Sequence, residues 1–200
     1  MIYLIASAIL QCLVFTLPGF LFYLIKNRSL RGFLPWVGLT WKHPDFTRRE
    51  NVLYSLIILG VMGTKILSVM FIEKQGSQLQ TSFQGMAPSV AIVSIFITAF
   101  INNGFSEEIL FRSYIGRGII HLLGYKTGNI VQSLIFTSIH LFVIVALGPA
   151  IGILTASMVF AMGYLMGRIM LRNCRNSIIW PILIHGGVNF IMYCLDYFVL

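Results

Sequence analysis

Apolar runs of about 20 residues recur along the chain, separated by short segments that carry most of the charged residues. A transmembrane α-helix needs roughly 20 consecutive apolar residues, so each run predicts one spanning helix. The expected spans are residues 2–25, 52–72, 88 to about 123, 130–147, 151–171 and 178–199. The pattern therefore predicts an all-α, polytopic transmembrane bundle of about six spanning helices.

Two of these segments have special features. Residues 88–123 are too many for one simple span, and their second half is polar and contains glycines. We therefore expect a tilted or broken helix there, or a spanning helix followed by one on the membrane surface. Residues 2–25 lack a cationic N-terminal region and a small-residue cleavage site, so we expect a retained helix, kinked near Pro18.

Composition defines the class of protein. Hydrophobic residues make up 58% of the 200 residues, charged residues only 10%, and the mean hydropathy is +0.87. Soluble domains are far more polar, so we expect an integral membrane protein with a single transmembrane domain over residues 1–200. Cys12, Cys174 and Cys194 are scattered and lack CxxC spacing, so they indicate packing residues rather than a disulfide framework or a thiolate metal site.

Basic residues gather in the connections on one side of the six-span arrangement. Twelve of the 14 lie there: Lys26, Arg28, Arg31, Lys42, Arg48, Arg49, Arg112, Arg117, Lys126, Arg168, Arg172 and Arg175. Basic loops stay in the cytoplasm, so we expect a multi-pass protein of the cell membrane with both termini outside. A basic face against anionic lipid accounts for the formal net charge of +8, and no nucleic-acid partner is expected.

Small residues and helix breakers mark places of close packing. Two glycine pairs have GxxxG spacing: Gly148 with Gly152, and Gly163 with Gly167. We favour contacts within the bundle for both, with a homodimer as the alternative. Before the last span, Ser177 resembles a helix N-cap and Pro181 is expected to loosen or kink the helix.

Two adjacent glutamates lie in the polar half of the third segment, where ionisable groups are costly and usually functional. Glu108 and Arg112 are four residues apart on one helical face and can form an ion pair. Glu107 points about 100 degrees away and has no partner at i+3 or i+4, so it is the better candidate for a base. Solvation of both carboxylates near the cytoplasmic surface is the alternative.

Two histidines lie on later spans. Phe136 and His140 share a helical face, and His140 is expected midway along the fourth span. His185 and Asn189 are likewise four residues apart on the last span. A lone histidine in a membrane often serves only as a hydrogen-bonding contact between helices, so neither motif alone indicates chemistry.

Together these residues could form a hydrolytic centre. A carboxylate with a histidine can orient and deprotonate water, and a second histidine and an asparagine can donate hydrogen bonds to the oxyanion. Glu107, His140 and His185 could instead supply a His2Glu zinc site, although the H-E-x-x-H helix is absent. A serine or cysteine protease is less consistent, because no nucleophile elbow is present and Cys174 has no histidine nearby in sequence.

The order of these motifs along the chain resembles that of one known protein family. They are E-E-x-x-x-R (Glu107, Glu108, Arg112), F-x-x-x-H (Phe136, His140) and H-x-x-x-N (His185, Asn189), with N-S-x-x-x-P from Asn176 to Pro181 and the glycine pair Gly163 and Gly167. This set resembles the CPBP intramembrane proteases, also called the Abi or CAAX-protease family, which includes Ras-converting CAAX endopeptidases. The resemblance covers residues 107–189, whereas the first two spans match only in being hydrophobic.

The resemblance implies an all-helical intramembrane endopeptidase. The roles it assigns are water activation by Glu107, partnership by His140, an oxyanion hole of His185 and Asn189, and support by Glu108 and Arg112. It favours a metal-free mechanism and no cofactor, with zinc on Glu107, His140 and His185 as the alternative. The chain has fewer predicted spans than the Ras-converting members, which argues for a different substrate.

The first functional hypothesis is a glutamate-type intramembrane protease. It would act on a peptide or small membrane protein, in bacteriocin self-immunity or peptide maturation, as in the bacterial immunity-type members. The expected partners are that substrate and the lipid bilayer, with a homo-oligomer left open. The alternatives are a non-catalytic immunity or scaffold protein and a prenyl-protein CAAX endopeptidase. A transporter could use the same ionisable groups, but the chain lacks matching halves.

Overall fold

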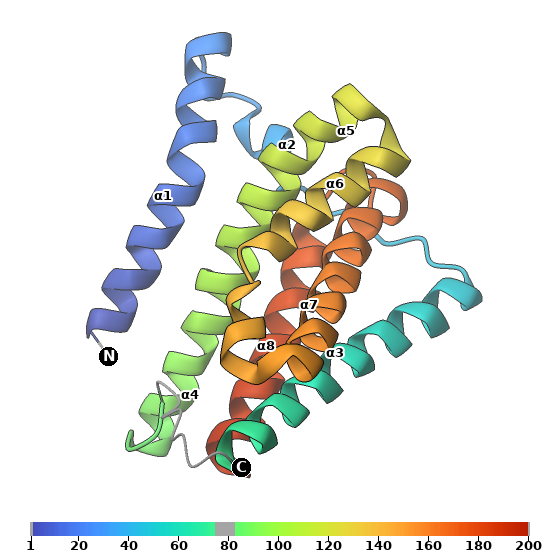
Figure 1. Ribbon diagram of the computed structural model, residues 1–200. Coiled ribbons are helices and arrows are strands. Elements are labelled where there is room, and N and C mark those ends of the chain that lie inside the picture. The colour runs from blue at the N-terminus through green and yellow to red at the C-terminus, as the bar shows by residue number, and fades with distance from the viewer. Residues whose placement is uncertain (1, 75–82, 200) are drawn as a thin grey trace.

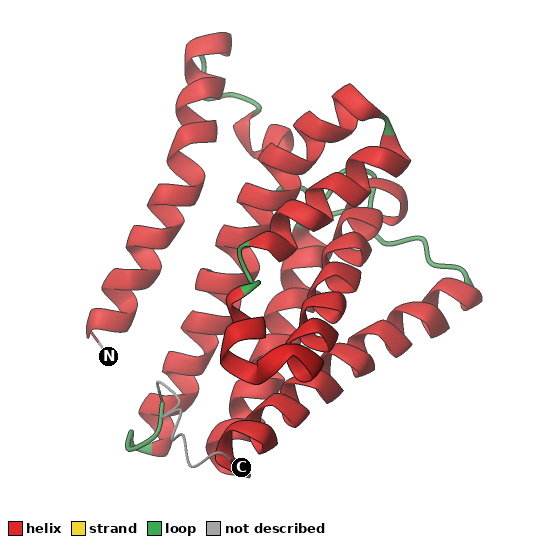
Figure 2. Ribbon diagram, viewed as in Figure 1, coloured by secondary structure: helices red, strands yellow, loops and turns green. Residues whose placement is uncertain are grey.

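The computed structural model describes residues 2–74 and 83–199, and every regular element in that part of the chain is helical (Figure 2). The elements are α1 (Ile2–Asn27), α2 (Phe33–Val37), α3 (Arg48–Lys74), α4 (Pro88–Phe96), η1 (Ile97–Gly116), α5 (Arg117–Leu123), α6 (Tyr125–Ser138), α7 (Phe142–Arg168), η2 (Ile169–Asn173) and α8 (Ile179–Phe198). The predicted all-α fold is confirmed.

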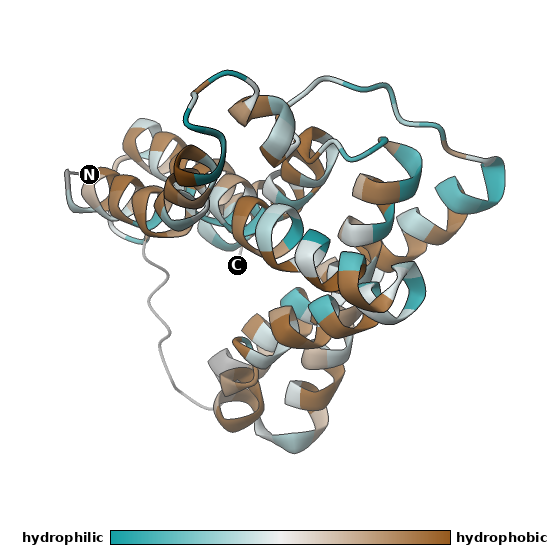
Figure 3. Cartoon of the chain, turned by 90° about the horizontal axis from the view of Figure 1, so that it is seen from above, coloured by the Kyte–Doolittle hydropathy of each residue, from teal (hydrophilic) through white to brown (hydrophobic). Residues whose placement is uncertain are grey.

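Long apolar helices dominate the bundle. Within the described residues, five stretches are long and apolar enough to cross a membrane: Tyr3–Asn27, Arg48–Phe71, Pro88–Leu123, Phe142–Asn173 and Ile179–Phe198. Seen along the bundle in Figure 3, α1 is largely hydrophobic, whereas the connection from α2 to α3 and the start of α3 are hydrophilic. The chain is therefore a polytopic membrane protein.

The fourth predicted span, residues 130–147, is not a single helix. Helix α6 ends at Ser138, a turn follows, and α7 begins at Phe142. His140 terminates α6, because its N–H donates to Thr137 O (2.8 Å) and its Nδ1 lies 2.8 Å from Phe136 O. These contacts satisfy carbonyls that lack partners at a helix end. The expectation that His140 lies midway along a spanning helix was therefore wrong.

A second break follows within α7. Gly148 has φ 73° and ψ 165°, a conformation that only glycine adopts readily, and Pro149 follows it directly. The chain thus descends through α6 and the first residues of α7, turns, and ascends along the rest of α7 (Figure 1). This broken passage takes the place of the fourth span, so the start of α1 and the end of α8 lie at the same end of the bundle.

The long third segment is one continuous helical path. Helix α4, η1 and α5 follow one another without a loop over Pro88–Leu123, 36 residues in all. The central part, η1, is a π-helix, a form that is rare and often found at functional sites. It lies in the middle of the bundle and contacts α1, α6 and α8. The segment is therefore neither broken nor bent into a separate surface helix.

Helices α6 and α7 pack closely because of small residues. A Cβ at Gly167 would lie 2.0 Å from Asn129 Oδ1, and a Cβ at Gly163 would lie 3.2 Å from the Phe136 ring. This GxxxG pair therefore serves a contact within the chain, as favoured from the sequence. Gly148 and Gly152 do not form such a face, because the first is the break in α7 and the second meets Ile144.

Buried polar side chains fill the interface that these glycines open. Gln132 Nε2 donates to Asn129 Oδ1 (2.8 Å) and to Gly163 O (3.0 Å), and Asn129 Nδ2 donates to Tyr164 O (3.1 Å). Hydrogen bonds between helices replace the hydrophobic driving force that is absent in lipid. The contact fixes α6, and with it the turn that carries His140.

A polar network ties the start of α3 to the end of α7. Arg168 Nη2 lies 2.7 Å from Glu50 Oε1, and Arg168 Nε donates to the Tyr54 hydroxyl at 2.8 Å. The Tyr54 hydroxyl donates to Asn173 Oδ1 (3.0 Å), and Asn173 Nδ2 donates to Asp45 O (2.7 Å). These contacts hold α3 against α7 at the end of the bundle where the basic residues gather.

We predict that Gly167→Ala destabilises the bundle. The added methyl would collide with Asn129 and with Gln132 Nε2 (2.8 Å), and overpacking typically costs about 1–3 kcal/mol in the free energy of unfolding. Thermal unfolding in detergent measures the loss. Gly118→Ala is the matched control, because a Cβ there meets no atom within 4 Å. Equal stability of the two variants would contradict the close packing of α6 on α7.

Candidate active site

The motif residues of three helices meet inside the bundle. Glu107, Glu108 and Arg112 come from η1, Phe136 from α6, His140 from the turn after it, and His185 and Asn189 from α8. Helices η1 and α8 approach closely because both carry glycines at the contact: a Cβ at Gly104 would lie 3.3 Å from Gly186 Cα, and one at Gly186 would lie 2.5 Å from the Phe100 ring. This approach brings the carboxylates of η1 to the imidazole of α8.

His185 lies between the two glutamates. Its Nδ1 is 2.8 Å from Glu108 Oε1, and its Nε2 is 3.9 Å from Glu107 Oε2. The first distance is a hydrogen bond, whereas the second is too long for one and leaves that side of the ring free. The two adjacent glutamates on η1 therefore differ, because Glu108 forms a hydrogen bond with the His185 ring and Glu107 does not.

Glu108 is fully buried and paired. Its Oε2 lies 3.1 Å from Arg112 Nε, and both side chains have no exposed surface. Glu108 and Arg112 form an ion pair without a well-aligned hydrogen bond. Within the described part of the chain, none of the three guanidinium nitrogens of Arg112 has a hydrogen-bond partner. The ion pair predicted from the i, i+4 spacing is present, and the bond from Glu108 to His185 is an addition that spacing could not reveal.

Phe136 connects the motifs. The Arg112 guanidinium carbon lies 4.2 Å from the centre of its ring, a cation–π contact that compensates a buried cation. The same ring is 4.8 Å from the ring of His140 and 6.1 Å from the ring of His185, centroid to centroid. Phe136, the phenylalanine of F-x-x-x-H, thus lies next to a residue of each of the three motifs.

Glu107 is partly exposed, unlike its neighbour Glu108. Its side chain is 15% exposed and that of His185 is 11% exposed, whereas Glu108 is sealed. Glu107 interacts electrostatically with His185 and also with His140. The fold therefore places both histidines close enough to Glu107 to interact with it electrostatically.

Asn189 lies one turn beyond His185 and meets a residue that the sequence analysis did not include in the site. Lys65 Nζ, from the middle of α3, donates a hydrogen bond to Asn189 Oδ1. The ammonium also lies 5.4 Å from the centre of the Tyr193 ring, one further turn along α8. A lysine within an apolar span was the available signal, since such charges are rare and usually paired.

The segment just before α8 is held in place by the connection that follows α2. Ser177 Oγ donates to Thr40 O (2.6 Å) and accepts from Ile179 N (3.3 Å), while Ile178 N donates to Gly38 O (2.9 Å). The N-cap position in the structure is Ile178, so Ser177 lies one residue before the cap rather than at it, as the sequence had predicted. These bonds hold the start of α8 in place and thereby fix the position of His185 along the bundle.

The metal alternative fits the geometry poorly. Among the described residues, no three His, Cys, Asp or Glu side chains are grouped closely enough to hold a metal ion. Glu107, His140 and His185 are therefore not grouped as the ligand set that a zinc site requires.

Cys174 has the properties of a structural thiol. It is buried at the end of η2, and burial raises the pKa of its thiol to about 11. A thiol with such a pKa stays protonated near neutral pH and is a poor nucleophile. This agrees with its interpretation as a packing residue.

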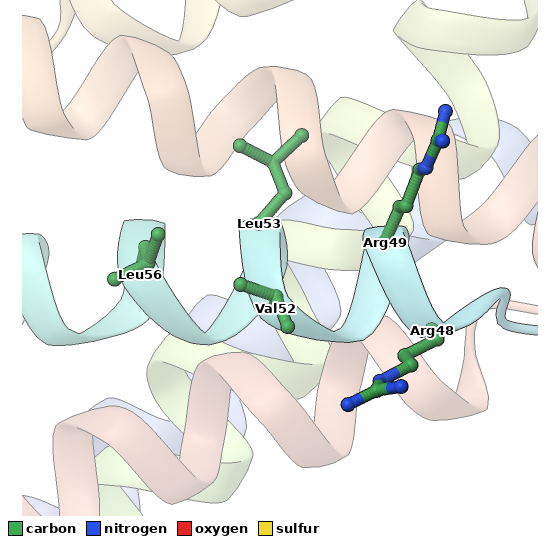
Figure 4. A pocket seen from close by; sticks show the side chains of 5 residues that line it. All are labelled: Arg48, Arg49, Val52, Leu53 and Leu56. Carbon is green, nitrogen blue, oxygen red and sulfur yellow. The ribbon is translucent and has the colours of Figure 1, made fainter.

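One hollow on the surface lies apart from these residues. It has a volume of about 400 Å³ and is lined by Arg48, Arg49, Val52, Leu53 and Leu56, all from the first turns of α3 (Figure 4). Its lining holds no carboxylate or imidazole, so it offers no acid–base chemistry.

Comparison with known proteins gives one match. A family model described as type II CAAX prenyl endopeptidase Rce1-like matches residues 89–191. Neither the curated proteins nor the solved structures yield a match. The matched region begins in α4, ends in α8 and contains all three motifs, about half of the chain. The chain therefore belongs to the Rce1-like family of type II CAAX prenyl endopeptidases, a family of membrane proteases.

Proposed function

We propose that this protein is an intramembrane endopeptidase that hydrolyses a peptide bond with a water molecule activated by Glu107. The observation that carries the proposal is the position of Glu107 Oε2, 3.9 Å from His185 Nε2 in the bundle interior. A water molecule can lie within hydrogen-bond distance of both atoms, which is the arrangement that general-base catalysis needs. Family membership supports the reaction class.

In this mechanism the two glutamates have different roles. Glu107 accepts a proton from water, the resulting hydroxide attacks the scissile carbonyl carbon, and the proton passes to the leaving amine as the C–N bond breaks. Glu108 accepts the Nδ1 hydrogen of His185 and holds the ring in place, while Arg112 compensates the charge of Glu108. His140, from the adjacent turn, assists Glu107 electrostatically.

The oxyanion formed in this attack needs hydrogen-bond donors. Asn189 Nδ2 and, when it carries a proton, His185 Nε2 supply them from one face of α8, since the two residues are one turn apart. Donors placed in a dry site in advance stabilise an oxyanion more strongly than water does. The mechanism uses no metal ion and no cofactor.

The substrate we propose is a peptide or a small membrane protein, processed in bacteriocin self-immunity or in peptide maturation. A scaffold or immunity protein without catalysis would gain little from four polar groups inside lipid, which supports the enzyme. A prenylated protein ending in a CaaX sequence is the second candidate, because the matching family is described as CAAX prenyl endopeptidases. In either case the substrate enters from the bilayer.

We predict that Glu107→Gln abolishes proteolysis. Loss of a general base lowers kcat by about 10²- to 10⁴-fold, and the bundle should assemble as before because glutamine is isosteric. Two probe substrates measure the loss of proteolysis. One is a farnesylated peptide ending in CaaX, and the other is the membrane-protein fraction of cells, in which new peptide termini are counted by mass spectrometry. The two probes separate the two substrate candidates.

Asp45→Asn is the matched control for this variant. It makes the same acid-to-amide change on an exposed loop residue and should leave both readouts unchanged. Full activity of Glu107→Gln on either probe would refute Glu107 as the base. A cellular immunity phenotype that persists in Glu107→Gln would assign that phenotype to a non-catalytic function.

Chelation tests the metal-free mechanism. Because Glu107, His140 and His185 are not grouped as zinc ligands, we expect prolonged treatment with a zinc chelator to leave cleavage unchanged. The same cleavage assay in detergent gives the answer, with a known zinc protease as the positive control. Loss of activity that returns on adding zinc would overturn this part of the proposal.

We propose that the end of the bundle with the basic residues faces the cytoplasm, so that Gln84, between α3 and α4, is outside. In a background without the three native cysteines, Gln84→Cys should react with a membrane-impermeant maleimide in intact cells. Thr127→Cys, exposed at the start of α6, should react only after permeabilisation. The reverse labelling pattern would invert the orientation.

A further inference from the structure

Lys65 occupies a distinctive place next to the motif residues. It lies in the middle of α3, in the half of the chain that the family model does not match, yet its ammonium reaches Asn189 on α8. A lysine inside a membrane span is costly, and its ammonium also lies over the aromatic ring of Tyr193, 5.4 Å from the ring centre. The Tyr193 hydroxyl in turn accepts from Asn103 Nδ2 of η1 at 3.0 Å.

The chemistry of this contact determines how the Asn189 amide is oriented. An ammonium group only donates hydrogen bonds, so the atom of the amide that it meets must be the carbonyl oxygen, Oδ1. The amide nitrogen Nδ2 then points to the opposite side. Nδ2 makes no hydrogen bond within the described residues and is not among their sealed polar atoms, so it remains accessible.

Without Lys65 the amide would lose this orientation. An asparagine side chain can rotate by half a turn and exchange its donor and acceptor with little change in shape. In the rotated form Oδ1 would face the reacting carbonyl and repel the developing oxyanion. The hydrogen bond from Lys65 removes that alternative before substrate arrives.

We infer that Lys65 is a positioning residue that fixes the Asn189 amide with Nδ2 directed at the oxyanion. The inference rests on the proposed function of the site and extends it to a residue outside the family motifs. Lys65 does not itself touch the reacting atoms in this account. Its contribution reaches the substrate only through Asn189.

Kinetics of a double-mutant cycle test the inference, with the farnesylated CaaX peptide as the probe. Asn189→Ala should lower kcat by about 10²- to 10³-fold, as for the loss of one oxyanion donor. Lys65→Met should lower kcat by a smaller factor at unchanged KM, and Lys65→Arg, which keeps a cationic donor, should retain more activity. In the Asn189→Ala background, Lys65→Met should cause no further loss.

Two kinetic outcomes would overturn the inference. An equal fold-loss from Lys65→Met in both backgrounds would show that the lysine acts independently of Asn189, for example by balancing the charge of Glu107. A raised KM at constant kcat would assign Lys65 to substrate binding instead. Lys42→Met, the same change on an exposed loop residue, serves as the matched control and should be fully active.

A second readout does not depend on turnover. In nitrogen-15-labelled protein, the Asn189 side-chain amide, assigned by its absence from Asn189→Ala, should give one pair of resonances that broadens or doubles in Lys65→Met. An unchanged amide signal in Lys65→Met would refute the inference even if no peptide is cleaved. Conversely, an active Glu107→Gln variant would refute the proposed function while leaving the amide measurement valid.

Discussion

The structure depends on the need to compensate buried charge inside a membrane. Four ionisable side chains, Glu107, Glu108, Arg112 and Lys65, lie in the interior of the bundle. Glu108, Arg112 and Lys65 each contact a partner from another turn or another helix, whereas Glu107 lies 3.9 Å from His185 Nε2 without a hydrogen bond. His185 connects the two glutamates, because each of its two nitrogens faces one of them. The pairing lets Glu108 stay sealed while Glu107 stays accessible, and this difference makes adjacent identical residues chemically distinct.

The remainder of the fold serves to bring these groups together. The π-helix η1 carries both carboxylates, and glycines on η1 and α8 allow the two backbones to approach. The interface of α6 with α7 closes on Gly163 and Gly167, which places the Phe136 ring against Arg112 and beside both histidines. Packing by small residues thus determines the electrostatics of the site.

Residue spacing predicted much of this arrangement and missed what depends on tertiary contacts. Hydrophobic runs were sufficient for the all-helical membrane fold, and the i, i+4 rule predicted the pair of Glu108 with Arg112. The rule could not show that Glu108 also bonds His185, because that contact joins η1 to α8. The turn at His140 was missed because the flanking residues, Ile139 and Leu141, are apolar and continue the hydrophobic run. The sequence shows Lys65 as a charge within a predicted span, but only the fold shows that it meets Asn189.

The central claim is that Glu108 holds His185 through Nδ1 and leaves Nε2 facing Glu107. Nitrogen-15 spectroscopy of histidine-labelled protein in lipid nanodiscs tests it directly, because protonated and bare imidazole nitrogens have well-separated shifts and His185→Gln identifies the signal. The account predicts a protonated Nδ1 whose hydrogen is bonded to a carboxylate. A bare Nδ1 with the ring proton on Nε2 alone would contradict it.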